Sequence, residues 1–76
     1  MYLLLVEVDT FEVAGLRFGS VEMVREAIER ILGDRGCAPG ADDFNKLMWS
    51  MCSNLDAEWR WCHQKGGVEI TVRRYA

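Results

Sequence analysis

The chain begins with a nearly continuous apolar stretch, residues 2–8, in which branched side chains dominate and neither glycine nor proline occurs. This pattern predicts a β-strand, and a second strand is predicted over residues 11–18, after a turn at Asp9 and Thr10. Gly15 inside the second strand indicates a bulge or a close backbone approach. Residues 2–8 are apolar on both faces of the predicted strand, so we expect a hairpin whose first strand is central in a sheet.

The next segment has the period of an amphipathic helix. Ser20 predicts its N-terminus, because a serine hydroxyl can accept a hydrogen bond from a free amide of the first turn. Apolar residues then recur at steps of three and four and form one stripe: Val21, Val24, Ile28, Ile31 and Leu32. Glu26 and Arg30 are spaced to pair across one turn, and Gly33 or Gly36 can supply the left-handed residue that ends the helix.

A second amphipathic helix is predicted after the loop that contains Pro39. Asp42 or Asp43 can cap it, and Ser53 with Asn54 favours its end. Its apolar stripe consists of Phe44, Leu47, Met48, Met51 and Leu55. Trp49 lies about 100° or more from the centre of that stripe, so we expect its ring to be marginal or exposed.

Residues 57–64 fit two patterns. Trp59 and Cys62 continue the helical spacing, whereas Trp59, Trp61 and His63 alternate as in a strand. We prefer a strand, because paired tryptophans suit a pleated surface and residues 65–67 form a hairpin turn before an alternating segment with Val68, Ile70 and Val72. A helix that runs unbroken to residue 64 is the alternative.

These elements predict an α+β fold with the order ββααββ. We expect a two-layer sandwich in which a four-stranded, mainly antiparallel sheet carries both helices on one face. With 76 residues, 50% of them hydrophobic, the chain is expected to form a single small domain over residues 1–76.

The net charge of −3 divides into −5 over residues 1–57 and +2 over residues 58–76. A net acidic chain disfavours general binding to phosphate backbones. Three cysteines cannot close two disulfides, which favours a reducing compartment. No apolar run approaches the about 20 residues of a membrane-spanning helix, and the first residues carry no basic leader, so we expect a cytoplasmic protein without membrane contact.

The soft metal ligands of the chain are Cys37, Cys52, Cys62 and His63, but their spacing forms no zinc-binding motif. We expect Cys52 and Cys62 to be small core residues and Cys37 to lie in a loop. The glycines form no phosphate-binding loop, and no signature of a nucleophile with its base is present. We therefore expect neither a cofactor nor enzymatic activity, and a small cysteine-dependent or metal-dependent enzyme is only a third interpretation.

Basic and aromatic residues are interleaved near the C-terminus, in a set that comprises Trp59, Arg60, Trp61, His63, Lys65, Arg73, Arg74 and Tyr75. Single-stranded nucleic acids bind to such sets, because bases stack on the rings while cations contact phosphates. Binding of single-stranded nucleic acid by this hairpin is therefore the alternative function. Against it, tryptophans that alternate on a strand belong more often to a core.

A protein-binding surface accounts for more of these features. If both helices cover one face of the sheet, apolar residues of the first hairpin on the opposite face stay uncovered. The partner is then a different protein or, in a homodimer, a second copy of the chain. The predicted partner-binding residues are Leu3, Leu5, Leu16, Phe18, Trp49, Trp59, Trp61, Arg73, Arg74 and Tyr75.

No motif identifies a family. In its size, acidity and lack of catalytic motifs the chain resembles small bacteriophage proteins that inhibit host enzymes or CRISPR complexes by occupying a surface. The resemblance is one of type and covers no specific residues. It implies a non-enzymatic, stoichiometric inhibitor as one form of the expected interaction module.

Overall fold

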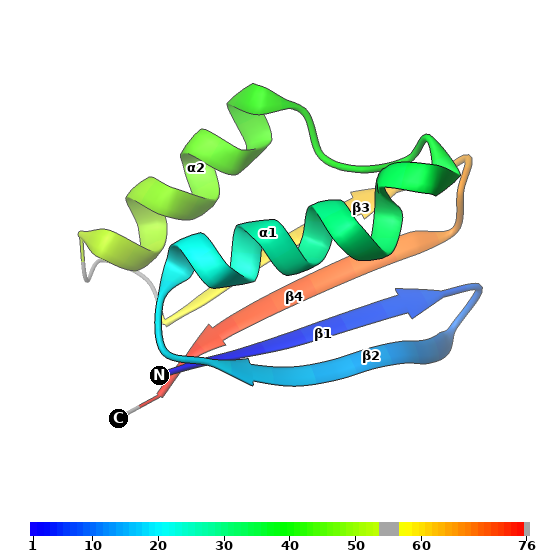
Figure 1. Cartoon of the computed structure of the whole chain (residues 1–76). Coiled ribbons are helices and arrows are strands. Elements are labelled where there is room, and N and C mark those ends of the chain that lie inside the picture. Colours follow the sequence, from blue (N-terminus) through cyan, green and yellow to red (C-terminus); the bar gives the residue numbers. More distant parts are fainter. Residues whose placement is uncertain (54–56, 76) are drawn as a thin grey trace.

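The predicted ββααββ order is found in the computed structural model, which describes residues 1–53 and 57–75 (Figure 1). The described strands are β1 (Tyr2–Val8), β2 (Phe11–Phe18), β3 (Glu58–His63) and β4 (Val68–Arg74). The described helices are α1 (Val21–Leu32), α2 (Ala41–Cys52) and a 3-10 turn, η1 (Gly33–Arg35). Asn54 and Leu55, which the sequence assigns to the end and the stripe of the second helix, lie outside the described residues.

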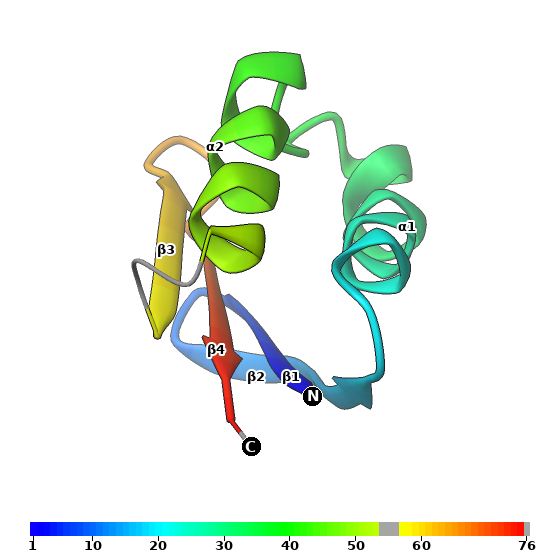
Figure 2. The ribbon, with the colours of Figure 1, turned by 90° about the vertical axis from the view of Figure 1, so that its left-hand side faces the viewer.

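The four strands form one antiparallel sheet in the order β2-β1-β4-β3. Strand β1 therefore lies in the interior, as its apolar character on both faces predicts. Both helices lie on the same side of the sheet (Figure 2), so the predicted α+β architecture is confirmed. The two ends of the chain meet at one end of the sheet (Figure 1), where the Tyr75 amide donates to the Met1 carbonyl.

The core lies between the helices and the face of the sheet that they cover, which we call the helix face. Central strands and helices each contribute fully buried side chains, which include Leu4, Val6, Ile28, Leu32, Leu47, Met51, Ile70 and Val72. Each of them stabilises the fold by about 1.5–3 kcal/mol relative to an exposed position. The stripes that the sequence predicts for both helices therefore face this core, with Ile31 and Met48 at its margin.

Helix α1 begins as predicted. The Ser20 hydroxyl oxygen accepts a hydrogen bond from the Met23 amide at 3.3 Å. At the other end Gly36, with φ of +68°, takes the left-handed conformation after η1, whereas Gly33 stays right-handed. On the exposed side of α1, Arg25 Nε lies 3.2 Å from Glu29 Oε1 in an ion pair. Among the described residues, Glu26 and Arg30, which are spaced to pair, form no such contact.

Helix α2 begins at Ala41, two residues earlier than a cap at Asp42 would allow. Gly40 occupies the N-cap, and Asp42 and Asp43 lie inside the first turn. The Asp43 carboxylate accepts a hydrogen bond from the Gly40 amide at 3.3 Å. Both aspartates therefore stabilise the positive end of the helix dipole from within the helix, and the prediction that one of them is the N-cap is wrong.

Residues 58–63 form a strand, so the preferred interpretation of this segment is confirmed and the continuous helix is excluded. The turn that follows is tied to its own strand, because the Gly66 amide donates to His63 Nδ1 at 3.0 Å. It also contacts the first hairpin, since the Gly67 carbonyl accepts a hydrogen bond from the Asp9 amide at 2.9 Å. Within residues 1–53 and 57–75 no helix has the length and apolar character needed to cross a membrane.

The β1–β2 hairpin contains a bulge. Glu7 pairs with Glu12, but Val6 pairs with Ala14, which leaves Val13 as an extra residue in β2. Gly15 lies nearby without being the bulged residue. A Cβ atom there would lie 3.0 Å from Glu12 Oε1, so the absent side chain makes room for the Glu12 carboxylate.

Candidate functional site

The side of the sheet away from the helices is the back face. Directly paired residues project to the same face, and the buried Leu4 and Val6 fix which side is the helix face. Leu3 and Leu5 alternate with them and lie, half-buried, on the back face, as predicted.

Leu16 and Phe18 do not share that face. Leu16 pairs with Leu4, and Phe18 pairs with Tyr2, so both project to the helix face. A regular hairpin with the same turn would have placed Leu16 opposite Leu3. The bulge shifts the register by one residue and thereby moves both side chains to the other face. The prediction that all four form one apolar back surface is therefore wrong.

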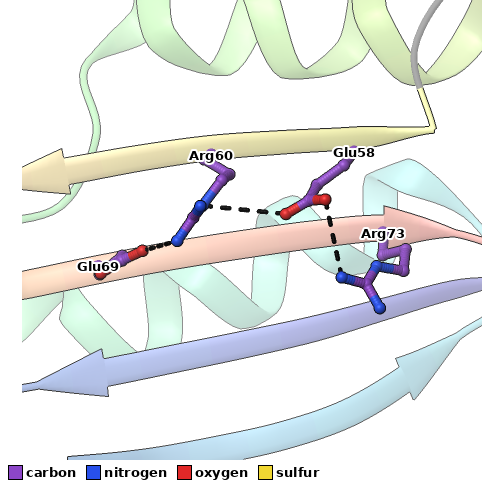
Figure 3. A network of polar contacts seen from close by, with 4 residues as sticks. All are labelled: Glu58, Arg60, Glu69 and Arg73. Atoms are coloured by element: carbon purple, nitrogen blue, oxygen red, sulfur yellow. Dashed lines mark hydrogen bonds and ion pairs between the residues drawn. The ribbon is translucent and has the colours of Figure 1, made fainter. Parts of the chain in front are cut away.

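The back face carries an ion-pair network on β3 and β4 (Figure 3). The Arg60 guanidinium binds Glu69 and lies 3.9 Å from Glu58, whose other carboxylate oxygen lies 3.7 Å from Arg73. The hydrogen bond and the charge of Glu69 raise the pKa of Arg60 above its ordinary value. Pairs this exposed stabilise the fold only weakly, but they make the face hydrophilic. An antiparallel sheet with such a face can stand open to solvent.

Two tryptophans and two arginines of the C-terminal hairpin lie on opposite faces of the sheet. Trp59 and Trp61 pair with Val72 and Ile70 and pack, half-buried, against the core on the helix face. Arg60 and Arg73 lie on the back face. The structure therefore does not bring these rings and these arginines together on one platform.

The last two predicted residues of this hairpin have structural contacts of their own. Arg74 donates a hydrogen bond to the Met51 carbonyl at 3.0 Å, which ties β4 to the end of α2. The Tyr75 ring lies 5.8 Å from the Arg17 guanidinium, and its hydroxyl is buried without a hydrogen-bond partner among the described residues.

Trp49 is 63% exposed, which confirms its predicted position outside the apolar stripe. The fold brings it to Trp59, and the two rings line a shallow hollow between α2 and β3 together with Lys46 and Ser50. These tryptophans come from distant parts of the sequence, and no spacing predicts that they share a surface.

Cys37 lies in a loop, as predicted, but the prediction that Cys52 and Cys62 are core residues is wrong. Cys37 is buried, whereas Cys52 and Cys62 are exposed. Cys62 alternates with the tryptophans and therefore projects to the open back face, while Cys37 packs under the second hairpin turn, where a Cβ on Gly66 would lie 3.2 Å from it. Among the residues that the structure describes, no three His, Cys, Asp or Glu side chains gather as metal ligands would.

Among residues 1–53 and 57–75, the large exposed apolar side chains other than Met1 and Trp49 gather at or beside β2. Strand β2 is an edge strand, and Phe11 is 75%, Val13 45% and Leu16 44% exposed. Met23 of α1, 51% exposed, lies beside Leu16 in a groove between helix and strand. The groove is also lined by the apolar residues Phe18, Ala27 and Ile31 and by the charged residues Arg17, Glu26 and Arg30. We call the outer side of β2 and this groove the β2 edge.

Sequence reasoning found only Leu16 and Phe18 of the β2 edge. Met23 lies outside the apolar stripe of its helix. This position is a signal for an exposed apolar side chain, because a residue on the polar side of a helix does not pack into the core. For Phe11 and Val13 the sequence predicts only positions in a strand, because the edge position of β2 depends on the sheet order.

The other edge of the sheet is different. Strand β3 is shorter than β2, and its exposed residues are Glu58, Arg60 and Cys62. Charged side chains are a common protection of edge strands against pairing with another chain. Of the two edges, β2 is therefore the one with exposed apolar side chains beside its unpaired backbone.

Comparison of the chain with models of protein families, with curated protein sequences and with solved structures gives no significant match.

Proposed function

We propose that this protein is an interaction module that binds another protein chain by adding a β-strand to the β2 edge. The observation that carries the proposal is the combination of an eight-residue edge strand with exposed Phe11, Val13 and Leu16 along it. Edge strands present a row of unpaired amide and carbonyl groups, and an added strand satisfies them.

The groove beside β2 supports the same proposal. In strand addition, the backbone supplies affinity while alternate side chains of the incoming strand enter pockets next to the edge. Leu16 and Met23 line such a pocket on the helix side, together with the apolar residues named above. An incoming strand that places an apolar side chain there would cover both residues.

A stoichiometric inhibitor is a finer form of this function. A small, acidic module that occupies the surface of a host enzyme or CRISPR complex needs a binding edge and no catalytic group. The β2 edge can supply that contact, and the open back face can remain in solvent. Cytoplasmic action against such a partner is part of the proposal.

Affinity capture with matched variants tests the proposed function. Leu16→Lys places a charge on the β2 edge at a half-exposed position, and strand addition there should be lost while the fold survives. Leu5→Thr changes a half-buried leucine of the back face and serves as the control. Circular dichroism verifies that both variants are folded.

The captured proteins are compared by quantitative mass spectrometry of lysates from the source organism. A partner retained by wild type and by Leu5→Thr, but lost with Leu16→Lys, supports the proposal. Partners that all three proteins retain equally, or that Leu5→Thr alone loses, would reject the β2 edge as the binding surface.

A further inference from the structure

We infer that the strand added to the β2 edge is β2 of a second copy of this chain, antiparallel and centred on Leu16. This homodimer rests on the proposed function, and in it the chain that binds to the β2 edge is a second copy of the protein. The charge arrangement of β2 and the position of its bulge together favour this occupant and its register.

Symmetry limits how β2 can pair with itself. A two-fold axis perpendicular to the sheet makes two copies of β2 antiparallel neighbours and keeps both pairs of helices on one side. Opposite residues must then belong to the same face, because paired side chains project together. Residues 14–18 alternate regularly, since the bulge at Val13 lies before them. Within this segment an even-numbered residue can therefore face only an even-numbered residue of the second copy, and an odd-numbered residue only an odd-numbered one.

The register centred on Leu16 uses the whole regular segment. It sets Leu16 opposite Leu16, Gly15 opposite Arg17 and Ala14 opposite Phe18 of the other copy. A register centred on Arg17 would place two guanidinium groups opposite each other, which is unfavourable. One centred on Gly15 would reach the bulge after residues 14–16, and a bulge interrupts pairing.

The charges of β2 complement each other in this register. The Glu12 carboxylate lies over Gly15, because its Oε1 atom is 3.0 Å from where a Cβ of Gly15 would be. Arg17 of the second copy stands opposite Gly15 on the same back face and is therefore placed against Glu12. In the single chain Arg17 is exposed, and its guanidinium lies 5.8 Å from the centre of the Tyr75 ring. Because of the two-fold symmetry, this contact between opposite charges occurs twice in the dimer.

The apolar side chains complement each other on the helix face. The two copies of Leu16 meet at the axis, directly in front of the groove that each forms with its own Met23. Phe18 of each copy covers Ala14 of the other. Leu16 and Met23, about half-exposed in the single chain, thus become covered without any change in the core.

Sedimentation velocity over a wide range of protein concentration tests the dimer and its register. The full-length wild type should dimerise with a concentration-dependent equilibrium. Arg17→Glu should raise the dissociation constant about tenfold or more, since like charges then face each other at two contacts. Glu12→Arg should do the same. The double variant, Glu12→Arg with Arg17→Glu, should return the dissociation constant to within about threefold of wild type.

The rescue separates pairing from damage to the single chain, because the double variant loses the Arg17–Tyr75 approach as fully as Arg17→Glu does. A wild type that stays monomeric, or a double variant no better than the single ones, would overturn the inference. Monomeric wild type that still captures a partner through Leu16 leaves the proposed function intact, whereas failure of capture as well rejects both. Dimerisation lost with Leu5→Thr but kept with Leu16→Lys would also overturn it, in favour of a back-face dimer.

Discussion

Single residues at the two hairpin turns hold backbone conformations that most side chains avoid. Asp9 and Thr10 have φ of 51° and 70°, as a two-residue hairpin turn with a right-handed twist requires. Gly67 of the second turn has φ of +62° and carries the carbonyl that accepts from the Asp9 amide. The two turns therefore depend on each other, and Gly67 is the residue at their contact.

We predict that Gly67→Ala lowers the free energy of unfolding by about 1–2 kcal/mol from the left-handed φ alone. A Cβ atom at this position would also collide with the Asp9 carboxylate, which adds to the loss. Urea denaturation of wild type and variant measures the difference.

Gly33→Ala is the matched control. Gly33 has helical φ and ψ of −56° and −41°, and a Cβ there would meet open space. This substitution should leave the free energy of unfolding unchanged or raise it by about 0.5–1 kcal/mol. Equal losses for the two alanine variants would show that the second turn does not have the conformation described.

Among the elements, β2 has the largest effect on which side chains the surface exposes, because its bulge determines the face of the sheet on which each of them lies. Val13 is the extra residue, and without it Glu12 and Ala14 would be consecutive and would still pair with Glu7 and Val6. The bulge is thus an insertion into an otherwise regular hairpin. Leu16 and Phe18 keep their partners on β1 whether or not Val13 is present.

We predict that deletion of Val13 is tolerated, with a free energy of unfolding within about 1 kcal/mol of wild type, because surface changes of this kind are usually small. Deletion of Thr71 is the contrasting case. It lies in the interior strand β4, and its loss would shift every later residue of that strand to the wrong face. Circular dichroism and urea denaturation should show a folded first variant and an unfolded second one, and the reverse order would contradict the assigned register.

The elements also show what the sequence could and could not predict. The bounds of β1 and β2 and the Ser20 cap follow from local patterns of apolar and capping residues, and the structure confirms them. Gly15 indicates a bulge or a close approach in this strand, but no local pattern marks Val13 as the extra residue, since valine suits a regular strand as well as a bulged one. The prediction that Leu16 and Phe18 lie on the back face is wrong because of this bulge alone.

The candidate site was less predictable than the fold. Exposure of Trp49 follows from helical spacing, but its proximity to Trp59 and the edge position of β2 depend on the sheet order. The loop position of Cys37 follows from the sequence, but its burial does not, because it arises from a contact with the second hairpin turn. Cys52 and Cys62 are exposed, so the prediction that they are core residues is wrong. The spacing of apolar residues within one helix or strand does not predict its contacts with elements that are distant in the sequence.

At the scale of the whole molecule, the sheet has one covered face, one open hydrophilic face and two unequal edges. The ion-pair network on β3 and β4 makes that part of the back face hydrophilic, as a sheet face open to solvent can be. The β3 edge carries charged residues, whereas the β2 edge exposes Phe11, Val13 and Leu16. Association through β2 would extend the sheet and leave the core of each copy unchanged.

Amide hydrogen exchange of the wild type, followed residue by residue at low and high protein concentration, tests the β2 edge most directly. Pairing of β2 with a second copy should slow exchange within residues 14–18 as concentration rises, at those amides that point away from β1. Exchange along β3 should stay the same at both concentrations. Exchange in residues 14–18 that does not change with concentration, or protection that rises along β3 instead, would contradict the assignment of β2 as the edge through which the copies associate.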